Sequence, residues 1–209
     1  MGIHTSPTGR PWAEERLNRR KFPRSRFRAL WQHALALWSR VGVVSLQEMQ
    51  AEGLEGWLHT LELGSVLLTT VDLGPGRLAL RFSGAPGSDA LFLIRPIWEA
   101  RITRPGLPEL TIAPGEIALM QAGTTAMLEL PGGGRLDVGI LAPAPAGAPS
   151  LTTLGARVPA AHYLAFVAGY LLRVAPHAEE VAPVLRRHFI EALDMTLAGL
   201  STANSTDPQ

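Results

Sequence analysis

The sequence predicts a mainly β fold, an antiparallel β-barrel or jelly roll with one helix before it and two after it. Nine short runs rich in Val, Leu, Ile and Thr follow one another between residues 57 and 141. The turns that separate these runs are rich in Gly and Pro and are too short to hold crossover helices, which excludes a parallel sheet. Two longer apolar segments follow residue 159, and their length favours helices.

The composition fits one soluble domain. The chain has 209 residues, 46% of them hydrophobic and 18% charged, and a chain of this length can bury a sizeable core. Its 19 basic and 18 acidic residues nearly cancel, so no overall field attracts it to nucleic acid or to an anionic membrane. No apolar run approaches the roughly 20 residues that span a bilayer, and no signal peptide is expected. We therefore expect a cytoplasmic protein.

The N-terminal end is strongly basic. Eight basic but only two acidic residues lie between positions 10 and 28. Such a run is typical of a solvated tail, and a DNA-contacting arm is the alternative. We take 1–25 as a basic disordered tail. The apolar residues that follow recur at the spacing of one helical face and predict an amphipathic helix; they are Phe27, Leu30, Trp31, Ala34 and Trp38.

This helix and the strands together form one predicted domain, 26–141. The turns between strands include Gly74-Pro75-Gly76 and the glycine run 132–134, whose residues favour tight turns. The predicted strands are 57–63, 65–73, 77–82, 89–97, 99–103, 109–112, 116–120, 126–130 and 135–141.

The C-terminal part is predicted to be helical. Residues 142–150 contain repeated Pro and Ala and form a linker, because proline removes hydrogen-bond donors and fixes φ. The segment 151–200 carries two helices. The first, 160–174, is apolar almost all round, which favours burial against the barrel or against another subunit. The second starts near Pro183, and 201–209 is a polar, disordered tail.

Common catalytic arrangements are missing. No Gly-x-Ser-x-Gly string occurs, and the only lysine is Lys21, so neither a serine hydrolase elbow nor a phosphate loop is present. The absence of cysteine excludes disulfides, thiolate metal sites and cysteine nucleophiles. Metal-dependent barrels gather several His and carboxylate ligands, whereas the predicted strands contain one histidine, His59. We therefore expect no metal, no cofactor and no catalytic residue.

Four residues are candidates for ligand binding. Period-2 alternation places Trp57 and His59 on one strand face. Arg95 shares its parity with apolar neighbours, so its guanidinium either enters the interior, where it needs an anion, or reaches solvent at the strand end. Trp98 is the fourth. A purely structural role is the alternative: the histidine and the tryptophans would then be packed core residues. Arg81 is not a candidate, because it alternates with apolar residues as an exposed strand arginine does.

The order of segments resembles the ligand-binding sensor domain of AraC-type transcriptional regulators, a cupin-like barrel followed by helices. The resemblance rests on the aromatic helix 27–31, Leu78-Ala-Leu-Arg81-Phe82, Asp89-Ala-Leu-Phe-Leu93 and the Pro-Gly-acid turn in Leu110-Thr-Ile-Ala-Pro-Gly-Glu116-Ile-Ala-Leu119. It covers about residues 25–200. Two departures stand out. Met120 and Gln121 occupy positions where many relatives have an acidic residue. The residues after the linker are too few for the family's DNA-binding domain, which contains two helix-turn-helix motifs.

The resemblance implies effector binding inside the barrel and dimerisation through the C-terminal helices. We therefore predict a non-enzymatic sensor domain without its own DNA-binding domain, which binds a small organic effector through Trp57, His59, Arg95 and Trp98. A homodimer is expected, with no membrane contact and no direct DNA contact. The predicted dimerisation residues are Leu171, Leu185, Phe189 and Leu193. The alternatives are a cupin-type enzyme, an isomerase or dioxygenase, and a DNA-associated protein that acts through the basic arm.

Overall fold

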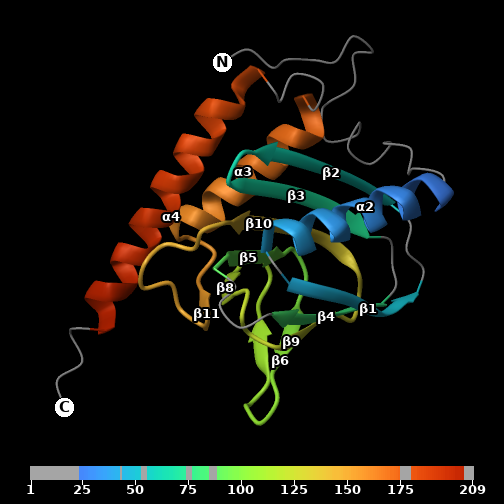
Figure 1. The fold of residues 1–209 in the computed structure, drawn as a ribbon, viewed down its shortest axis with the longest axis horizontal. Helices are drawn as coiled ribbons and strands as arrows, with labels where there is room; N and C mark the ends of the chain where they lie inside the picture. The colour runs from blue at the N-terminus through green and yellow to red at the C-terminus, as the bar shows by residue number, and fades with distance from the viewer. Residues whose placement is uncertain are drawn as a thin grey trace.

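The structure, a computed structural model, describes residues 24–42, 44–52, 56–73, 77–84, 89–174 and 180–204. In this part of the chain, two antiparallel sheets are accompanied by one helix before and two helices after them (Figure 1). The predicted fold class, mainly antiparallel β with one helix before the strands and two after them, is confirmed. The predicted tail 1–25 lies outside the described residues except for its last two, and so does the end of the other tail, 205–209.

Every strand pair within the two sheets is antiparallel. The five-stranded sheet has the order β1 (Val44–Glu52), β4 (Arg77–Gly84), β9 (Ala126–Leu130), β6 (Ala100–Thr103) and β7 (Leu110–Ile112). The six-stranded sheet has the order β11 (Leu151–Leu154), β8 (Ile117–Gln121), β5 (Leu91–Pro96), β10 (Gly134–Leu141), β3 (Val66–Leu73) and β2 (Gly56–Leu63). Nine of these strands match the predicted runs to within a few residues.

Two edge strands were not predicted. β1 reads Val-Ser-Leu-Gln-Glu-Met-Gln-Ala-Glu, whose Gln, Glu and Ala residues have weak β propensity. It forms because it pairs along its length with β4, with a register shift between Glu48 and Gln50. β11 lies inside the segment 151–200 that was predicted to be helical, and it pairs with β8. Tertiary pairing, which local propensity does not encode, creates both strands.

The N-terminal helix α2 (Arg24–Gly42) completes the core between the sheets. Its residues Phe27, Trp31 and Trp38 are almost fully buried. The two indole rings meet edge to face, with centroids 5.8 Å apart. The indole N–H of Trp38 donates to Thr69 Oγ1 at 3.0 Å, so its polar atom is satisfied inside the core. The amphipathic pattern of this segment therefore predicted the correct buried face.

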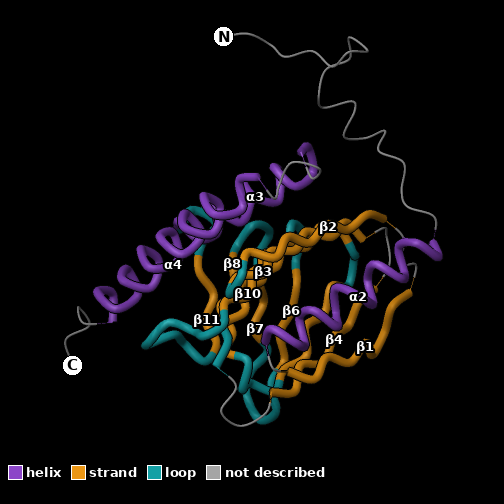
Figure 2. The backbone as a smooth tube through the Cα atoms, turned by 45° about the horizontal axis from the view of Figure 1, so that its top comes forward, coloured by secondary structure: helices purple, strands orange, loops and turns teal. Residues whose placement is uncertain are grey.

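The two C-terminal helices, α3 (Pro159–Val174) and α4 (Ala182–Asn204), lie together on one side of the strands, apart from α2 (Figure 2). They pack on the outer face of the six-stranded sheet, where alternate residues of β3, β5 and β8 are apolar and buried. This second core includes Leu68, Leu93, Leu119, Leu164 and Phe189. A Cβ built on Gly139 of β10 would lie 2.9 Å from Phe189 Cζ, so the absence of a side chain there lets α4 approach the sheet.

The predicted linker 142–150 packs against the six-stranded sheet. Gln121 of β8 donates from Nε2 to the carbonyl oxygen of Ala148 at 2.7 Å, and its backbone N–H donates to Ser150 at 3.1 Å. The segment is therefore an ordered strap along the sheet edge that leads into β11.

Candidate functional site

The structure places Trp57 and His59 side by side on β2, with ring centroids 5.8 Å apart. Both share parity with Leu61 and Leu63, which belong to the core under α3 and α4, whereas Leu58 faces the space between the sheets. The predicted common face is therefore present. It is the outer face of the six-stranded sheet, not the barrel interior that was expected. On this face Leu61 and Leu63 are buried in the core under the C-terminal helices, whereas Trp57 and His59 are half-buried.

Arg95 lies on the same outer face and contacts Asp137, which is 1% exposed. Arg95 Nη1 lies 2.9 Å from Asp137 Oδ2, and Arg135 Nε lies 2.9 Å from Asp137 Oδ1. Thr70 donates to the same carboxylate at 2.7 Å. His59, Thr70, Asp137 and Arg95 are neighbours in register across four strands.

This cluster is balanced in charge. Asp72 lies opposite Arg135 in register, so two arginines meet two aspartates. Arg95 Nε is buried and has no hydrogen-bond partner among the described residues, but its guanidinium already has a buried counter-ion. The arrangement fits a cross-strand ion network that holds β3, β5 and β10 together better than it fits an anion site.

Trp98 stands apart from the other three candidates. It lies between β5 and β6, is 62% exposed, and packs its indole ring on Gly134, where a Cβ would clash with it. The structural alternative considered for Trp98, a core tryptophan, is therefore wrong, since the connection after β5 carries the ring to the surface. The structure thus brings Trp57, His59 and Arg95 onto one face and leaves Trp98 elsewhere.

The predicted dimerisation residues are buried within the chain. Leu185, Phe189 and Leu193 are at most 5% exposed and belong to the core between α4 and the six-stranded sheet. They cannot contact a second copy without opening that core, and this corrects the prediction. Their apolar face was read correctly, but this chain's own sheet covers it. The side chain of Leu171 lies outside the described residues.

A groove of about 510 Å³ lies instead on the outer face of the five-stranded sheet. The even-numbered residues 78–82 of β4 face the core, so Arg81 and Ser83 point outward. Arg104 follows β6, at the start of the loop that projects from the strands in Figure 1. The lining residues are Arg81, Ser83, Thr103, Arg104, Pro105, Thr125, Ala126 and Met127.

The two arginines of this groove have no carboxylate partner among the described residues. Arg101, on the same face, differs: it lies 3.1 Å from Glu99 and 3.8 Å from Glu109. The hydrogen bond with Glu99, followed by the charge of Glu109, raises the pKa of Arg101 above its ordinary value. No ion pair engages Arg81 or Arg104 in this part of the structure, so their charge is available to an anionic ligand.

Sequence reasoning missed this groove. It interpreted Arg81 as an ordinary exposed strand arginine and did not consider Arg104. The alternation of Arg77, Ala79, Arg81 and Ser83 on β4 could have indicated a polar outer face. No sequence pattern brings Arg104, which lies 23 positions later, to the same groove, because that proximity depends on the strand order β4-β9-β6.

Two further observations concern metals and membranes. Within the described residues, no group of three or more His, Asp or Glu side chains comes together as metal ligands do. None of the described helices combines the length and apolar character that crossing a membrane requires.

Comparisons with known proteins give only distant likenesses. No protein-family model matches the chain, and no curated protein does. Among solved structures, the AraC-like transcriptional activator CuxR is similar over 80% of this chain and 64% of its own chain, with 14% identity and a TM-score of 0.43. The chain thus spans less than two thirds of that protein.

Two other solved structures are similar over about half of this chain. The oxalate decarboxylase OxdC of Bacillus subtilis matches 49% of this chain and 29% of its own, with 11% identity and a TM-score of 0.34. A Cupin 2 conserved barrel domain protein of Salinispora arenicola matches 47% and 74%, with 11% identity and a TM-score of 0.27. With every TM-score below 0.5, these likenesses decide neither the family nor the function of this chain.

Proposed function

We propose that this chain is a non-enzymatic effector-binding domain of the AraC-type sensor class, and that its effector is a small organic anion bound in the groove on the five-stranded sheet. The jelly-roll fold and the ordered sequence motifs support the sensor class. A cytoplasmic location belongs to the same proposal. The chain itself makes no DNA contact in this account.

The observation that carries the proposal is the presence in one groove of two arginines, Arg81 and Arg104, that form no ion pair with any described residue. Guanidinium groups bind carboxylates and phosphates through charge-assisted hydrogen bonds. The hydroxyl groups of Ser83, Thr103 and Thr125 add neutral donors and acceptors beside Arg81 and Arg104. The volume of about 510 Å³ lies within the range of ordinary small-molecule sites.

A screen by thermal unfolding tests the proposal. A panel of small carboxylates and phosphate esters is added at low ionic strength, where surface charges are least screened. An anion at 100 times its Kd stabilises the folded state by about 2.7 kcal/mol. The Arg81→Ala/Arg104→Ala variant should lose this stabilisation, and the matched variant Arg77→Ala, on the same strand face, should keep it.

The proposal fails if no member of the panel stabilises the protein, or if the double variant responds as the wild type does. Metal analysis of the purified protein addresses the non-enzymatic part separately. A stoichiometric Fe, Mn, Ni or Zn content would favour the cupin-type enzyme instead.

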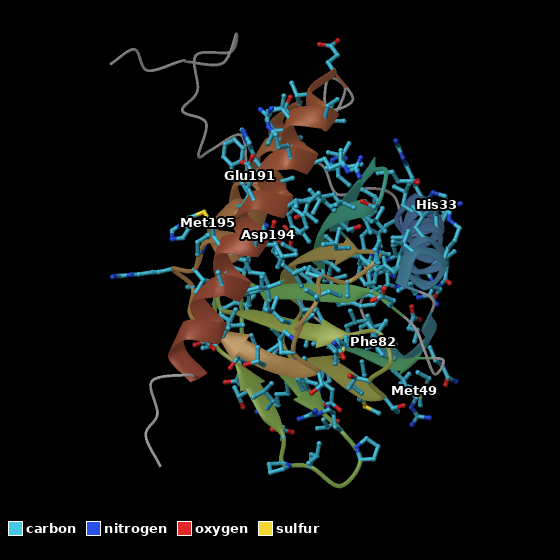
Figure 3. The ribbon with its side chains drawn as sticks, turned by 60° about the vertical axis from the view of Figure 1, so that its left-hand side comes forward. His33, Met49, Phe82, Glu191, Asp194 and Met195 are labelled. Carbon is cyan, nitrogen blue, oxygen red and sulfur yellow. The ribbon has the colours of Figure 1, made fainter. Side chains whose placement is uncertain are left out.

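The expected homodimer remains part of the proposal, with a different contact surface. On α4, Arg187 and Glu191 are more than 60% exposed, and Val184 and Met195 are also exposed; Figure 3 shows Met195 pointing away from the strands, among which Phe82 lies. Along the exposed side of α4, Arg187 precedes the acidic residues Glu191 and Asp194. An antiparallel pair of α4 helices would therefore place opposite charges together.

Light scattering tests this surface. Arg187→Glu should reduce the dimer mass because it places like charges together, and adding Glu191→Arg in the same chain should restore it. A monomeric wild-type protein, or a dimer that neither change affects, would exclude α4 as the contact.

A further inference from the structure

We propose that the groove on the five-stranded sheet selects a ligand with two anionic ends joined by an apolar chain, the chemistry of an α,ω-dicarboxylate. The inference rests on the proposed function, because it names the ligand class of the same groove. It follows from the separation of the two arginines and from the residues between them.

The strand order sets the separation. Arg81 of β4 and Thr103 of β6 are both in register with Met127 of β9, from opposite sides. Neighbouring strands lie about 4.8 Å apart, so the Cα atoms of Arg81 and Thr103 are about 10 Å apart. Arg104 follows Thr103 directly. The two arginine side chains therefore start from opposite sides of the groove, with the whole width of β9 between their Cα atoms.

The charges of the two guanidinium groups disfavour their close approach. They carry like charges, and their mutual repulsion grows as they approach. Neither has a carboxylate partner among the described residues that would draw it to the centre. A ligand with a single anionic group engages both arginines only by pulling the like charges together. A ligand with two separated anionic groups meets each arginine near its own wall.

The floor between the arginines is mainly apolar. Met127, which is half-buried, and the backbone of Ala126 lie there, and Pro105 borders the side of Arg104. Of the described residues that line this groove, none is acidic; Glu129 lines the neighbouring smaller groove with Arg77 and Arg101. A methylene chain can lie on this floor while its ends reach the arginines and the flanking hydroxyl groups. A compact polyanion would leave the apolar floor without a partner.

A series of probes of graded length tests the inference. Titration calorimetry compares succinate, adipate, suberate and sebacate with the monoacid octanoate and with inorganic phosphate. Affinity should peak at suberate or sebacate, the longer members of the series, because the strands that carry the arginines are separated by about 10 Å. Suberate should bind at least about tenfold more tightly than octanoate, because a second charge-assisted hydrogen bond contributes that much or more.

Single variants test whether each arginine binds one carboxylate of the ligand. Arg81→Ala and Arg104→Ala should each reduce the affinity for suberate to about that for octanoate, whereas Arg77→Ala should leave it unchanged. Arg81→Lys should restore part of the lost affinity, since it keeps the charge. Because Arg81 is exposed and Arg104 lies in a loop, these variants should fold; circular dichroism checks this.

The outcomes separate the two proposals. If octanoate, succinate or phosphate binds as tightly as suberate in an Arg81-dependent way, the groove binds anions but does not select two separated ends, and this inference is wrong while the proposed function stands. If no probe binds to the wild-type protein, the proposed function itself is contradicted.

Discussion

The outer faces of the two sheets have the same period-2 geometry but opposite chemistry. On the six-stranded sheet, part of the outer face is aliphatic and packs under α3 and α4; the residues of β3, β5 and β8 in this core are Val66, Leu68, Leu91, Leu93, Ile117 and Leu119. On the five-stranded sheet, the outward positions of β4 carry Arg77 and Arg81, and a groove opens there. One face is a second core, and the other is a surface that can bind.

The comparison shows that the role of a strand arginine depends on whether a counter-ion lies beside it. Arg95 and Arg81 are both strand arginines on outward faces. Arg95 lies against the buried Asp137, whereas Arg81 lines an open groove and has no counter-ion within the part of the chain that the structure describes. A buried, paired arginine contributes to the structure, and an exposed, unpaired one is available to a ligand. The sequence suggested the reverse assignment for these two residues.

The helix-covered face should be the more sensitive to mutation. Phe189→Ala removes a fully buried ring that packs on Gly139. We expect a loss of about 4 kcal/mol in the free energy of unfolding, the usual cost of emptying such a site. Urea denaturation measures it. Val184→Ala, an exposed position on the same helix, is the control and should cost less than about 0.5 kcal/mol; similar costs for both would mean that α4 does not form this core.

Mutation of the ion network around Asp137 should cause the second-largest loss in the free energy of unfolding. Asp137→Ala leaves Arg95 and Arg135 without their shared carboxylate and is expected to cost about 3 kcal/mol. Arg95→Ala should cost less, because Asp137 keeps Arg135 and Thr70 as partners. The same denaturation measurement checks the order. A larger loss for Arg95→Ala would show that the network is not centred on Asp137.

Tyr163, which also lies on the helix-covered side, should make a smaller, pH-dependent contribution to the free energy of unfolding. Its hydroxyl donates to the carbonyl oxygen of Leu185 at 2.9 Å, and burial, with a smaller effect of the Glu191 charge, raises the pKa of Tyr163 from 10.0 to about 12. Since the folded pKa is the higher one, the stabilisation is complete below pH 10 and is lost as the pH rises towards 12. Tyr163→Phe should cost about 1 kcal/mol at neutral pH.

Urea denaturation of both proteins at neutral pH and at about pH 11 separates the two contributions. The wild type should lose stability over this interval more steeply than Tyr163→Phe. Parallel losses would show that another group is responsible for the pH dependence.

Mutations on the outer face of the five-stranded sheet, which we call the bare face, should have the smallest effect on stability. Arg81→Ala changes an exposed side chain with no ion pair in the described structure, so the free energy of unfolding should change by less than about 0.5 kcal/mol. Thermal unfolding without ligand measures this. A large destabilisation would mean that Arg81 has a structural role, and binding data on the variant would then need the Arg81→Lys protein as the reference.

The sequence predicted the fold well because the fold depends on local patterns. Alternation within β2 to β10 and the apolar face of α2 identify the strands and the buried helix side without tertiary information. β1, whose polar sequence forms a strand only by pairing with β4, could not be predicted in this way. The position of the candidate residues in the fold could not be predicted for the same reason. Parity placed Trp57, His59 and Arg95 on one face of a strand or sheet, but it could not tell which face the helices cover.

Calorimetry with the anion that most stabilises the wild-type protein tests most directly whether the bare face of the five-stranded sheet is the binding face. Three proteins are compared: the wild type, Arg81→Ala/Arg104→Ala and Arg95→Ala. We predict that Arg95→Ala binds with wild-type affinity and that the double variant shows no measurable binding. Loss of binding in Arg95→Ala together with wild-type affinity in the double variant would contradict the account and place the ligand on the helix-covered sheet.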